Sequence, residues 1–304
     1  MHSDLRQTGA WGDYLTKIDW HVEFIGKTQV TIKCLPFLNI SVIKIQHATP
    51  PLPFAQIDAI AHKYHAALVV IEPDYRKYDE SIYVKNGYIR TNFAYMHTAT
   101  IMIDLKQTNE ALLKSFSENA RRNIKKSQNN NLAIEHIFLN KTKKTDTFDR
   151  FYDLFANLSR LKHFYLPPKK ELSEKIIALR NLTFVSFAYE KSGSEPIAAI
   201  WFCYFDNMLY YLNTGATARG YELLANYLLV WEGLQEGQKH GLEIFDFGGI
   251  YDPRYPRLRQ SAKKYSQFKK RFHGTLIEYP SSWIKFYSFP FKLFYLCSSR
   301  LFNW

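Results

Sequence analysis

The sequence is poor in cysteine and has no long apolar run, and each shortage excludes a class of protein. Its three cysteines, Cys34, Cys203 and Cys297, are scattered and form no pair at metal-ligand or redox spacing. Such a set is typical of a reducing cytosol, and we expect each thiol to be a small core residue rather than a reactive group. The longest apolar stretch, residues 196–205, is too short to span a bilayer. The opening MHSDLRQTGAWGDYL has no apolar segment for export, so we expect a cytoplasmic protein.

The short motifs of several enzyme classes are also absent from the sequence. It contains no G-x-S-x-G, no H-E-x-x-H, no Walker loop and no G-x-G-x-x-G. A serine nucleophile, zinc hydrolysis and nucleoside triphosphate chemistry are therefore poorly supported. His62 and His65 have the spacing of a metal pair on a helix, but no third ligand stands nearby in the sequence, so we expect no metal site. An acetyl-CoA enzyme usually carries a glycine-rich pyrophosphate loop, and TGATARGYELL, with only Gly215 and Gly220, matches it weakly.

Positive charge is what the sequence has in excess. Lys and Arg total 40 against 28 Asp and Glu, which gives a formal net charge of +12 at pH 7. This balance favours a polyanionic partner, either nucleic acid, a phosphorylated substrate or an anionic membrane face, without distinguishing among them. The 304 residues are 46% hydrophobic and 16% aromatic, enough for one large domain or for two of about 150 residues.

The first half of the chain mixes predicted strands and helices. The clearest element is a helix over residues 109–128, where Leu112, Phe116, Ala120 and Ile124 form one apolar stripe and Thr108 is the expected N-cap. The other expected elements are strands at 20–25, 30–34, 38–45, 66–73 and 98–105 and a helix at about 54–65.

The polar stretch at residues 139–147 predicts a domain boundary, with one domain at 1–144 and a second at 145–280. In the second half we expect a helix at 149–161, strands at 182–189, 196–205 and 208–213, a long helix at 221–240, a strand at 243–249, a basic helix ending near 272 and a strand at 275–279. Three antiparallel strands, a helix and then a strand beside them form the core order of N-acetyltransferase folds, so the predicted fold class is α+β.

Two clusters of cations stand out from the general positive charge. The first comprises Arg121, Arg122, Lys125 and Lys126, which follow one flank of the predicted helix at 109–128. No acidic residue is interleaved, which favours a strip that binds tRNA or another anion. An ordinary solvated helix face is the alternative.

The second cluster is FKKRFHG, in which Lys269, Lys270 and Arg271 stand between Phe268 and Phe272. On a helix, Tyr265, Phe268 and Phe272 fall on one side at spacings of three and four residues, so the aromatic residues are expected to anchor it. Lys269 and Lys270 then project beside a buried seam, where a fixed cation stabilises negative charge well. This arrangement suits a phosphate or the oxyanion of acyl transfer.

Five ordered segments of the chain resemble the Fem aminoacyl-transferases (FemA, FemB, FemX), which build the peptide branches of bacterial peptidoglycan precursors. Single motifs among them are only moderately specific, but the ordered set covers nearly the whole chain. The segments are LRQTGAWGDYL, TIMIDLKQTNEALLKSFSENARRNIKKSQNNNLAI, EPIAAIWFCYFDNMLYYLNTGAT, GLEIFDFGGI and QFKKRFHGTLIEY.

The resemblance implies a fold and a reaction. The fold would be two N-acetyltransferase (GNAT)-like domains that face each other across a cleft, without a coiled-coil arm, and residues 281–304 would return to the first domain. The donor would be an aminoacyl-tRNA, and the acceptor an amine on the stem peptide of a lipid-linked or UDP-linked peptidoglycan precursor. The chemistry would need no metal, no acetyl-CoA and no other cofactor, and the protein would be a monomer.

Site residues carry over from the family by their place in the motifs. Phe268 and Lys269 match the family's Phe-Lys pair, whose lysine is held to stabilise the tetrahedral intermediate. Tyr211 matches a tyrosine that lines the peptide channel, and Asp104 matches an aspartate that would handle the amine proton. Lys270 and Arg271 do not come from this match; we expect both to bind substrate because they adjoin Lys269, with Lys270 as a surface or phosphate contact.

The sequence departs from the family where an arginine would grip the precursor's phosphates. HFYLPPKKEL has Pro167 at the position of that arginine and Glu171 at the position of a nearby tyrosine. Lys169 or Lys170 could replace the arginine, and the acceptor stays open. The alternatives are a GNAT-fold N-acyltransferase that uses acyl-CoA or another donor, and a non-catalytic module that binds RNA or anionic lipid.

Residues 281–304 are rich in aromatic residues. Nine aromatic side chains, among them Trp283, Phe289 and Phe294, are interspersed with Lys285, Lys292 and Arg300. Aromatic residues with cations favour the headgroup zone of a membrane, which predicts a peripheral contact with the inner membrane face. A packed C-terminal helix is the alternative.

Overall fold

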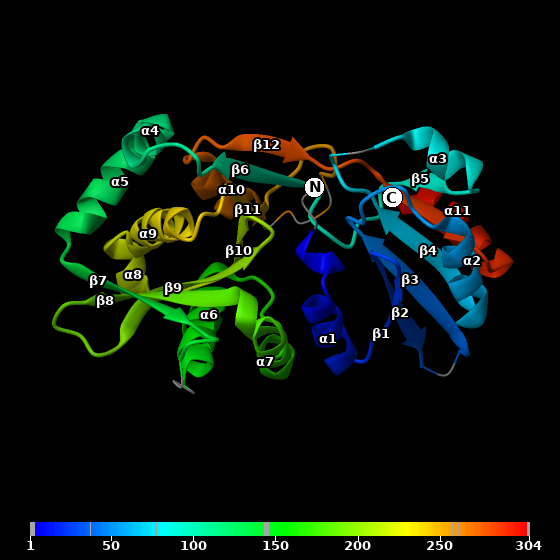
Figure 1. Cartoon of the computed structure of the whole chain (residues 1–304), viewed down its shortest axis with the longest axis horizontal. Coiled ribbons are helices and arrows are strands. Elements are labelled where there is room, and N and C mark those ends of the chain that lie inside the picture. Colours follow the sequence, from blue (N-terminus) through cyan, green and yellow to red (C-terminus); the bar gives the residue numbers. More distant parts are fainter. Residues whose placement is uncertain are drawn as a thin grey trace. The chain divides into compact units, whose positions relative to one another are not determined.

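The computed structural model describes residues 4–302, apart from residues 37, 77, 143–145, 257, 259 and 261 (Figure 1). It divides into two compact units. Unit 1 comprises Met1–Thr98 together with Glu278–Trp304, and unit 2 is the continuous segment Ala99–Ile277.

Unit 1 is built on a six-stranded sheet of order β1-β2-β3-β4-β13-β5. The pairs are antiparallel except for β3 and β4, which run parallel and are joined through α2. Its elements are η1 (Leu5–Gln7), α1 (Gly9–Lys17), β1 (His21–Ile25), β2 (Thr28–Leu35), β3 (Ile40–Gln46), α2 (Phe54–Lys63), β4 (Ala66–Glu72), α3 (Glu80–Lys85), β5 (Ile89–Thr91), β13 (Ser282–Phe286) and α11 (Phe289–Phe302).

The core of unit 1 follows from the burial pattern of its strands. β4 lies between β3 and β13 and is buried at almost every position, as expected of a central strand covered on both faces. Its neighbour β3 alternates instead, with Ile43 and Ile45 fully buried. Trp283 of β13 stacks on Tyr83 at 5.2 Å between ring centroids, so the last strand completes the core of the unit.

Unit 2 has a seven-stranded sheet of order β12-β6-β11-β10-β9-β8-β7. Strands β7 to β10 are antiparallel neighbours, and β11 runs parallel to β10 after α8 and α9. The elements are β6 (Ala99–Asp104), α4 (Asn109–Ser115), α5 (Glu118–Asn129), β7 (Leu132–Phe138), α6 (Thr147–Lys162), α7 (Lys169–Ala178), η2 (Arg180–Leu182), β8 (Thr183–Glu190), β9 (Pro196–Phe205), β10 (Met208–Ala216), α8 (Ala218–Glu222), α9 (Ala225–Lys239), β11 (Ile244–Gly249), α10 (Ala262–Lys270) and β12 (Thr275–Glu278).

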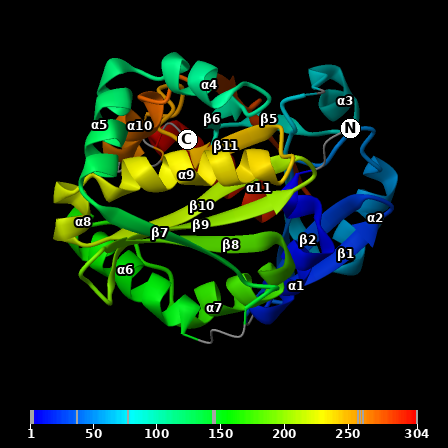
Figure 2. The ribbon, with the colours of Figure 1, turned by 60° about the vertical axis from the view of Figure 1, so that its left-hand side comes forward.

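Two helices cover opposite faces of this sheet, α9 on one side and α6 on the other (Figure 2). Because side chains of a strand alternate between the two faces of the sheet, successive residues of β9 contact different helices. Phe202 lies against Gly233 of α9, whereas Trp201 meets the ring of Phe151 of α6. Both β9 side chains are fully buried, so the strand is apolar on both faces.

The domain boundary predicted between residues 144 and 145 differs from the division that the structure shows. The two boundary residues lie outside the described residues, but β6, α4, α5 and β7, all predicted in the first domain, belong to unit 2. The reason is strand pairing, because β6 pairs with β11 and β7 with β8. The expected return of residues 281–304 to the first domain corresponds to β13, which pairs with β4 and β5.

Two helices predicted as continuous are each broken in the structure. The helix expected at 109–128 is α4 and α5, separated at Phe116, whose backbone is extended, and restarted by Ser117, which accepts a hydrogen bond from the amide of Ala120. The helix expected at 221–240 is α8 and α9, separated at Leu224, which has left-handed backbone angles. The expected N-cap Thr108 is confirmed, since its hydroxyl accepts from the amide of Ala111.

Candidate functional site

The candidate site lies where β10 and β11 separate. The two strands pair only from Met208 to Tyr210 against Ile244 to Asp246. Beyond this point β10 is irregular against β9, and β11 is irregular against β6. Because the parallel ladder ends here, backbone carbonyls after Asp246 accept hydrogen bonds from a side chain instead of from β10.

That side chain is Lys269 of α10. Its Nζ donates to the carbonyls of Phe247 at 2.7 Å and Gly249 at 2.9 Å. The residue is only 7% exposed. Its ammonium lies 5.3 Å from the ring centroid of Tyr211 and 5.0 Å from that of Tyr265. Two carbonyls and two aromatic rings therefore hold a buried positive charge in one place, as a preorganised electrostatic site requires.

Tyr211 forms the inner wall of this site. Burial raises the pKa of its hydroxyl well above the usual value, so the side chain is neutral at physiological pH. Its ring packs against those of Phe202 and Phe247. Tyr265, on the other side of the ammonium, is 41% exposed. The cation thus lies between a buried ring and a partly exposed one.

The aromatic residues of FKKRFHG anchor α10, as the sequence predicts. Phe272 is fully buried and contacts the ring of Phe116, while Phe268 contacts the ring of Tyr227 at 4.9 Å between centroids. Arg271 also ties the helix down, since its guanidinium donates to the hydroxyl of Tyr227 and its carbonyl accepts from the amide of Ser117. Arg271 therefore holds α10 to α9 and α5.

The buried stripe of α10 differs from the predicted one. Its buried members are Ala262, Ser266 and Lys269, whereas Tyr265 is exposed. Lys269 is therefore itself on the buried stripe rather than beside it. Lys270 is exposed, so the two neighbouring lysines have different environments.

A buried carboxylate that the sequence reasoning missed fixes the backbone beside Lys269. Asp246 accepts a hydrogen bond from the hydroxyl of Thr100 and another, at 2.7 Å, from the amide of Gly248. Gly248 has a φ of +67°, a conformation that favours glycine. The signal in the sequence was an aspartate between two phenylalanines in a predicted strand, where aspartate is disfavoured.

The structure does not bring Asp104 to Lys269. Asp104 is exposed at the end of β6, opposite Ile244, the first residue of β11. Phe247 lies three residues farther along β11, about 10 Å away at 3.3 Å per residue. The Asp104 carboxylate accepts from the amide of Lys106 at 2.9 Å, which makes it part of a local turn.

Lys169 and Lys170 begin α7 and line a cavity of about 530 Å³ on the surface of unit 2. The ammonium of Lys169 lies 2.6 Å from a carboxylate oxygen of Asp149, and this hydrogen bond raises the pKa of the lysine. Much of its charge is therefore already compensated. Lys170 is the better placed of the two to meet a phosphate.

The predicted anion strip on α5 contains three exposed cations, Arg122, Lys125 and Lys126. Arg121 is different, because its guanidinium donates to the carbonyls of Lys114, at 3.0 Å, and Phe116. It therefore satisfies the C-terminal end of α4. We use the name "α5 strip" below for Arg122, Lys125 and Lys126 only.

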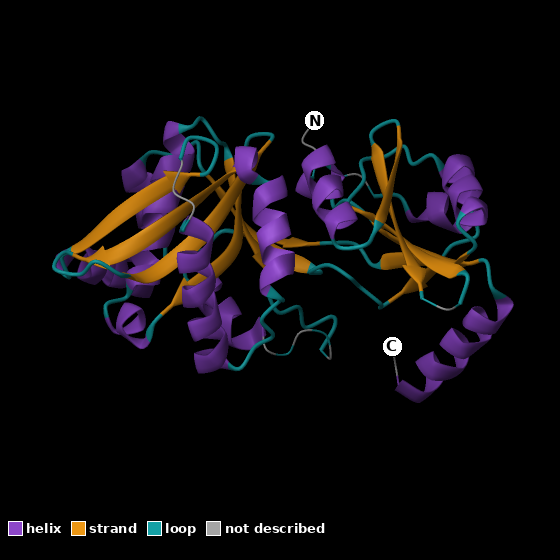
Figure 3. Ribbon diagram, turned by 90° about the horizontal axis from the view of Figure 1, so that it is seen from below, coloured by secondary structure: helices purple, strands orange, loops and turns teal. Residues whose placement is uncertain are grey.

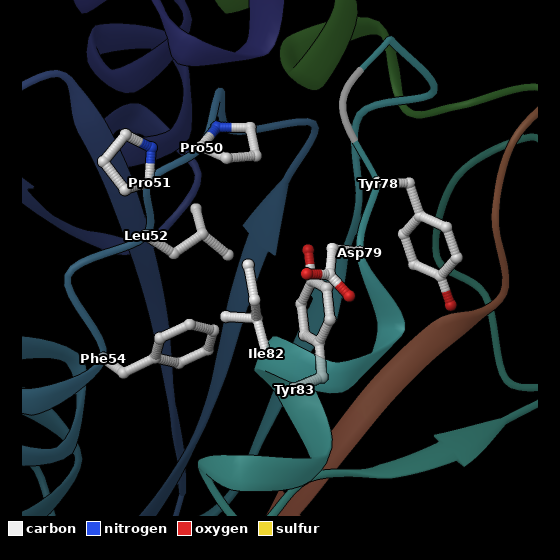
Figure 4. Close-up of a pocket in the computed structure, with 8 residues that line it drawn as sticks. All are labelled: Pro50, Pro51, Leu52, Phe54, Tyr78, Asp79, Ile82 and Tyr83. Atoms are coloured by element: carbon white, nitrogen blue, oxygen red, sulfur yellow. The ribbon is translucent and has the colours of Figure 1, made fainter.

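Unit 1 holds a cavity of about 350 Å³ of a different character (Figure 4). Leu52, Phe54 and Ile82 point toward one another, and Asp79 lies at its side (Figure 4). Asp79 accepts from the amide of Ser81, so it caps α3. The cavity is lined mainly by apolar side chains, which suit binding of an apolar group rather than catalysis.

Comparison with protein families finds a match that lies within unit 2. Residues 118–267 match the domain family described as acetyltransferase (GNAT) domain, and this range extends across the boundary predicted at 144/145. No curated protein matches the sequence.

Several solved structures have a similar fold. A crystal structure of FemX has a TM-score of 0.80 and 14% identity, and the match covers 96% of this chain and 94% of that one. The C-terminal domain of a putative lysylphosphatidylglycerol synthetase from Agrobacterium fabrum has a TM-score of 0.63 and 12% identity, with 92% and 88% covered. L-PGS from Bacillus licheniformis has a TM-score of 0.61 and 11% identity, with 93% and 90% covered.

These findings confirm the predicted fold class, α+β with two GNAT-like domains. Both sheets have the same core, an antiparallel meander followed by a helical crossover to a parallel strand. The predicted likeness to the Fem proteins is confirmed in the fold. Residues 118–267 thus match the acetyltransferase (GNAT) domain family, and the chain has the fold of FemX.

Proposed function

We propose that the protein is an acyltransferase of the Fem type, which moves an amino acid from aminoacyl-tRNA to an amine of a peptidoglycan precursor's stem peptide. The observation that carries this proposal is the buried ammonium of Lys269, held by the carbonyls of Phe247 and Gly249 between two tyrosine rings. Such a cation can stabilise an oxyanion without reorganising during the reaction.

The chemistry requires little else from the protein. The acceptor amine attacks the ester carbonyl of the aminoacyl group, a C–N bond forms, and negative charge appears on the carbonyl oxygen. The C–O bond to the tRNA ribose then breaks, and the proton from the amine ends on the ribose oxygen. Lys269 would act on the oxyanion, while Tyr211, neutral and buried, would shape the channel beside it.

In the turn that would bind the pyrophosphate of acyl-CoA, two backbone amides and Arg219 make internal contacts. The amide of Thr217 donates to the carbonyl of Ile197 at 2.9 Å, and the amide of Gly220 donates to the hydroxyl of Thr217 at 3.0 Å. Arg219 is paired with Glu190 and Glu222. These existing contacts support a donor other than acyl-CoA.

The decisive experiment offers the protein several donors with one precursor. We expect mass spectrometry to find an aminoacylated precursor after incubation with a charged tRNA pool, and ribonuclease treatment of that pool to abolish the product. Acetyl-CoA and longer acyl-CoA esters should give none. Product from a CoA ester that survives ribonuclease would favour the alternative N-acyltransferase, and no product from any donor would favour the binding module.

A second acceptor class is favoured by two of the similar structures, one named a putative lysylphosphatidylglycerol synthetase and the other L-PGS. Pro167 and Glu171 also leave the precursor's phosphates without the arginine and tyrosine expected in the family. The same assay should therefore include phosphatidylglycerol vesicles as acceptor. If the product is aminoacylated lipid rather than aminoacylated precursor, the acceptor is the lipid and the donor is still aminoacyl-tRNA.

The α5 strip is expected to contribute to tRNA binding. The double variant Arg122→Glu/Lys126→Glu should weaken tRNA affinity and reduce the slope of log affinity against log salt by about one to two units, since each phosphate contact contributes close to one. The matched control is Lys17→Glu/Lys27→Glu, which changes the net charge equally at exposed positions of unit 1. Equal slopes for the two double variants would make the strip an ordinary solvated face.

A further inference from the structure

The C-terminal segment of unit 1 has two parts with different environments. β13 is part of the fold, since Trp283 and Ile284 are buried and the ammonium of Lys285 lies 2.8 Å from both carboxylate oxygens of Asp58. The membrane contact predicted for residues 281–304 therefore cannot involve these residues. α11 is the part that remains, and in the view of Figure 3 it lies next to the C label, apart from the other helices of unit 1.

Tyr295 is one of the side chains that hold α11 to the unit. Tyr295 packs against the ring of Phe286 at 5.2 Å between centroids, and its hydroxyl lies 2.6 Å from that of Thr91. Several other apolar side chains among the described residues of the helix face solvent. Phe289 is 76% exposed and Phe294 is 73% exposed, and Leu293 and Leu296 are also exposed.

The exposed apolar side chains of α11 lie on two adjoining sides of the helix. Phe289, Leu293 and Leu296 follow one another at spacings of four and three residues and share one side. Phe294 directly follows Leu293 and points about 100° farther round the helix. A patch of this kind on a soluble monomer marks an interaction site. We call these four residues the α11 patch.

The charge around the patch identifies its partner. α11 itself contains Lys292 and Arg300 but no aspartate or glutamate, and the whole chain carries a formal charge of +12. A second copy of the chain would bring like charges together, which costs free energy. An anionic lipid surface has the opposite charge and accepts aromatic side chains at its headgroup boundary.

The length of the helix determines how it would meet the lipid. At 1.5 Å per residue the 14 residues of α11 extend about 21 Å, less than the hydrocarbon core of about 30 Å. Among the described residues no helix is both long and apolar enough to cross a membrane. The side chains of Arg300, Phe302 and Trp304 lie outside the described residues.

We propose that α11 binds in the plane of an anionic membrane surface, with Phe289, Leu293, Phe294 and Leu296 inserted at the headgroup boundary and Lys292 facing the lipid phosphates. This proposal is independent of the chemistry at Lys269. It would place the protein where lipid-linked acceptors are found.

The experiment is co-sedimentation of the full chain with vesicles of phosphatidylcholine containing phosphatidylglycerol. The double variant Phe289→Ser/Phe294→Ser should bind at least about 30-fold more weakly than the original protein, because two phenylalanines lose their burial in lipid. The matched control is Phe24→Ser/Tyr165→Ser, which removes two aromatic side chains that are 50% and 76% exposed elsewhere. Lys292→Glu should weaken binding to the vesicles more at low salt than at high salt, because salt screens the charge.

Further measurements on the same variants test whether they fold and whether a second copy of the chain is the partner. Thermal unfolding should show the same midpoint for the two double variants, since all four side chains are exposed. Transfer to a soluble precursor should be unchanged, which separates this proposal from the proposed function. Failure of the original protein to sediment, or an equal loss in the control, would overturn the proposal. Self-association that disappears in Phe289→Ser/Phe294→Ser without any vesicle binding would assign the patch to a second copy.

Discussion

Lys269→Met is expected to lower kcat by about 10²–10³-fold, while the affinities for tRNA and precursor change little. The ammonium is fixed by two backbone carbonyls between Tyr211 and Tyr265, so it would interact with charge that appears only as the tetrahedral intermediate forms. An interaction confined to the transition state affects turnover more than binding. Single-turnover rates and equilibrium binding, measured on the same variant, check this expectation.

The neighbouring lysines of α10 are the matched controls. Lys270→Met should raise KM and alter its salt dependence, as expected of an exposed phosphate contact, and Lys264→Met, also exposed, should leave both constants near their original values. Lys269→Arg should restore only part of the rate, because the planar guanidinium is larger and differently directed. A loss of affinity in Lys269→Met as large as the loss of rate would reduce all three cations to phosphate contacts.

The stability of Lys269→Met must be measured with its activity. Methionine leaves the carbonyls of Phe247 and Gly249 without the lysine donor, at a cost of about 1–3 kcal/mol for each buried group that stays unsatisfied. The variant should therefore unfold at a lower temperature yet remain folded at the temperature of the assay. Near-ultraviolet circular dichroism at that temperature distinguishes a chemical defect from an unfolded protein.

Gly220→Ala is expected to destabilise unit 2 by about 3 kcal/mol or more. A Cβ at Gly220 would lie 2.3 Å from the carbonyl oxygen of Ile197, a backbone atom of β9 that cannot rotate away. The contact belongs to the turn that takes the place of a pyrophosphate loop, so the same change would displace α8 from the sheet. Chemical denaturation followed by tryptophan fluorescence measures the effect.

Gly193→Ala is the control for this substitution. A Cβ at Gly193 would meet its nearest atom, the carbonyl oxygen of Glu190, at 3.5 Å, which is ordinary contact. Its stability should change by less than about 0.5 kcal/mol, as for most surface substitutions. Equal midpoints for the two alanine variants would show that β9 and α8 can move apart without cost.

The candidate site shows what a sequence pattern can and cannot predict. The FKKRF segment was found because its cations stand between aromatic residues, yet the pattern did not single out the buried lysine. A search for an apolar helix face treats lysine as polar. It also gives little weight to small residues such as Ala262 and Ser266, which are buried here and let α10 approach its neighbours. Ser266 can be buried because its hydroxyl donates to the carbonyl of Ala262 and accepts from the amide of Tyr251.

Local periodicity predicted most strands but not their partners. The run at 98–105 was expected as a strand, and β6 occupies Ala99–Asp104, but its pairing with β11 joins residues about 140 positions apart. Nothing in the alternation of side chains encodes that distance. A polar stretch at 139–147 was therefore mistaken for a boundary, although β7, directly before it, pairs with β8 after it.

The position of β13 has a consequence for the order in which the protein can fold during synthesis. β13 lies between β4 and β5, so the sheet of unit 1 cannot close until residues 282–286 have left the ribosome. Unit 2 is one continuous segment, Ala99–Ile277, and all of its residues are made before that point. The unit that begins the chain is therefore the last to be completed, and until then the edge of β4 needs protection from pairing with other chains.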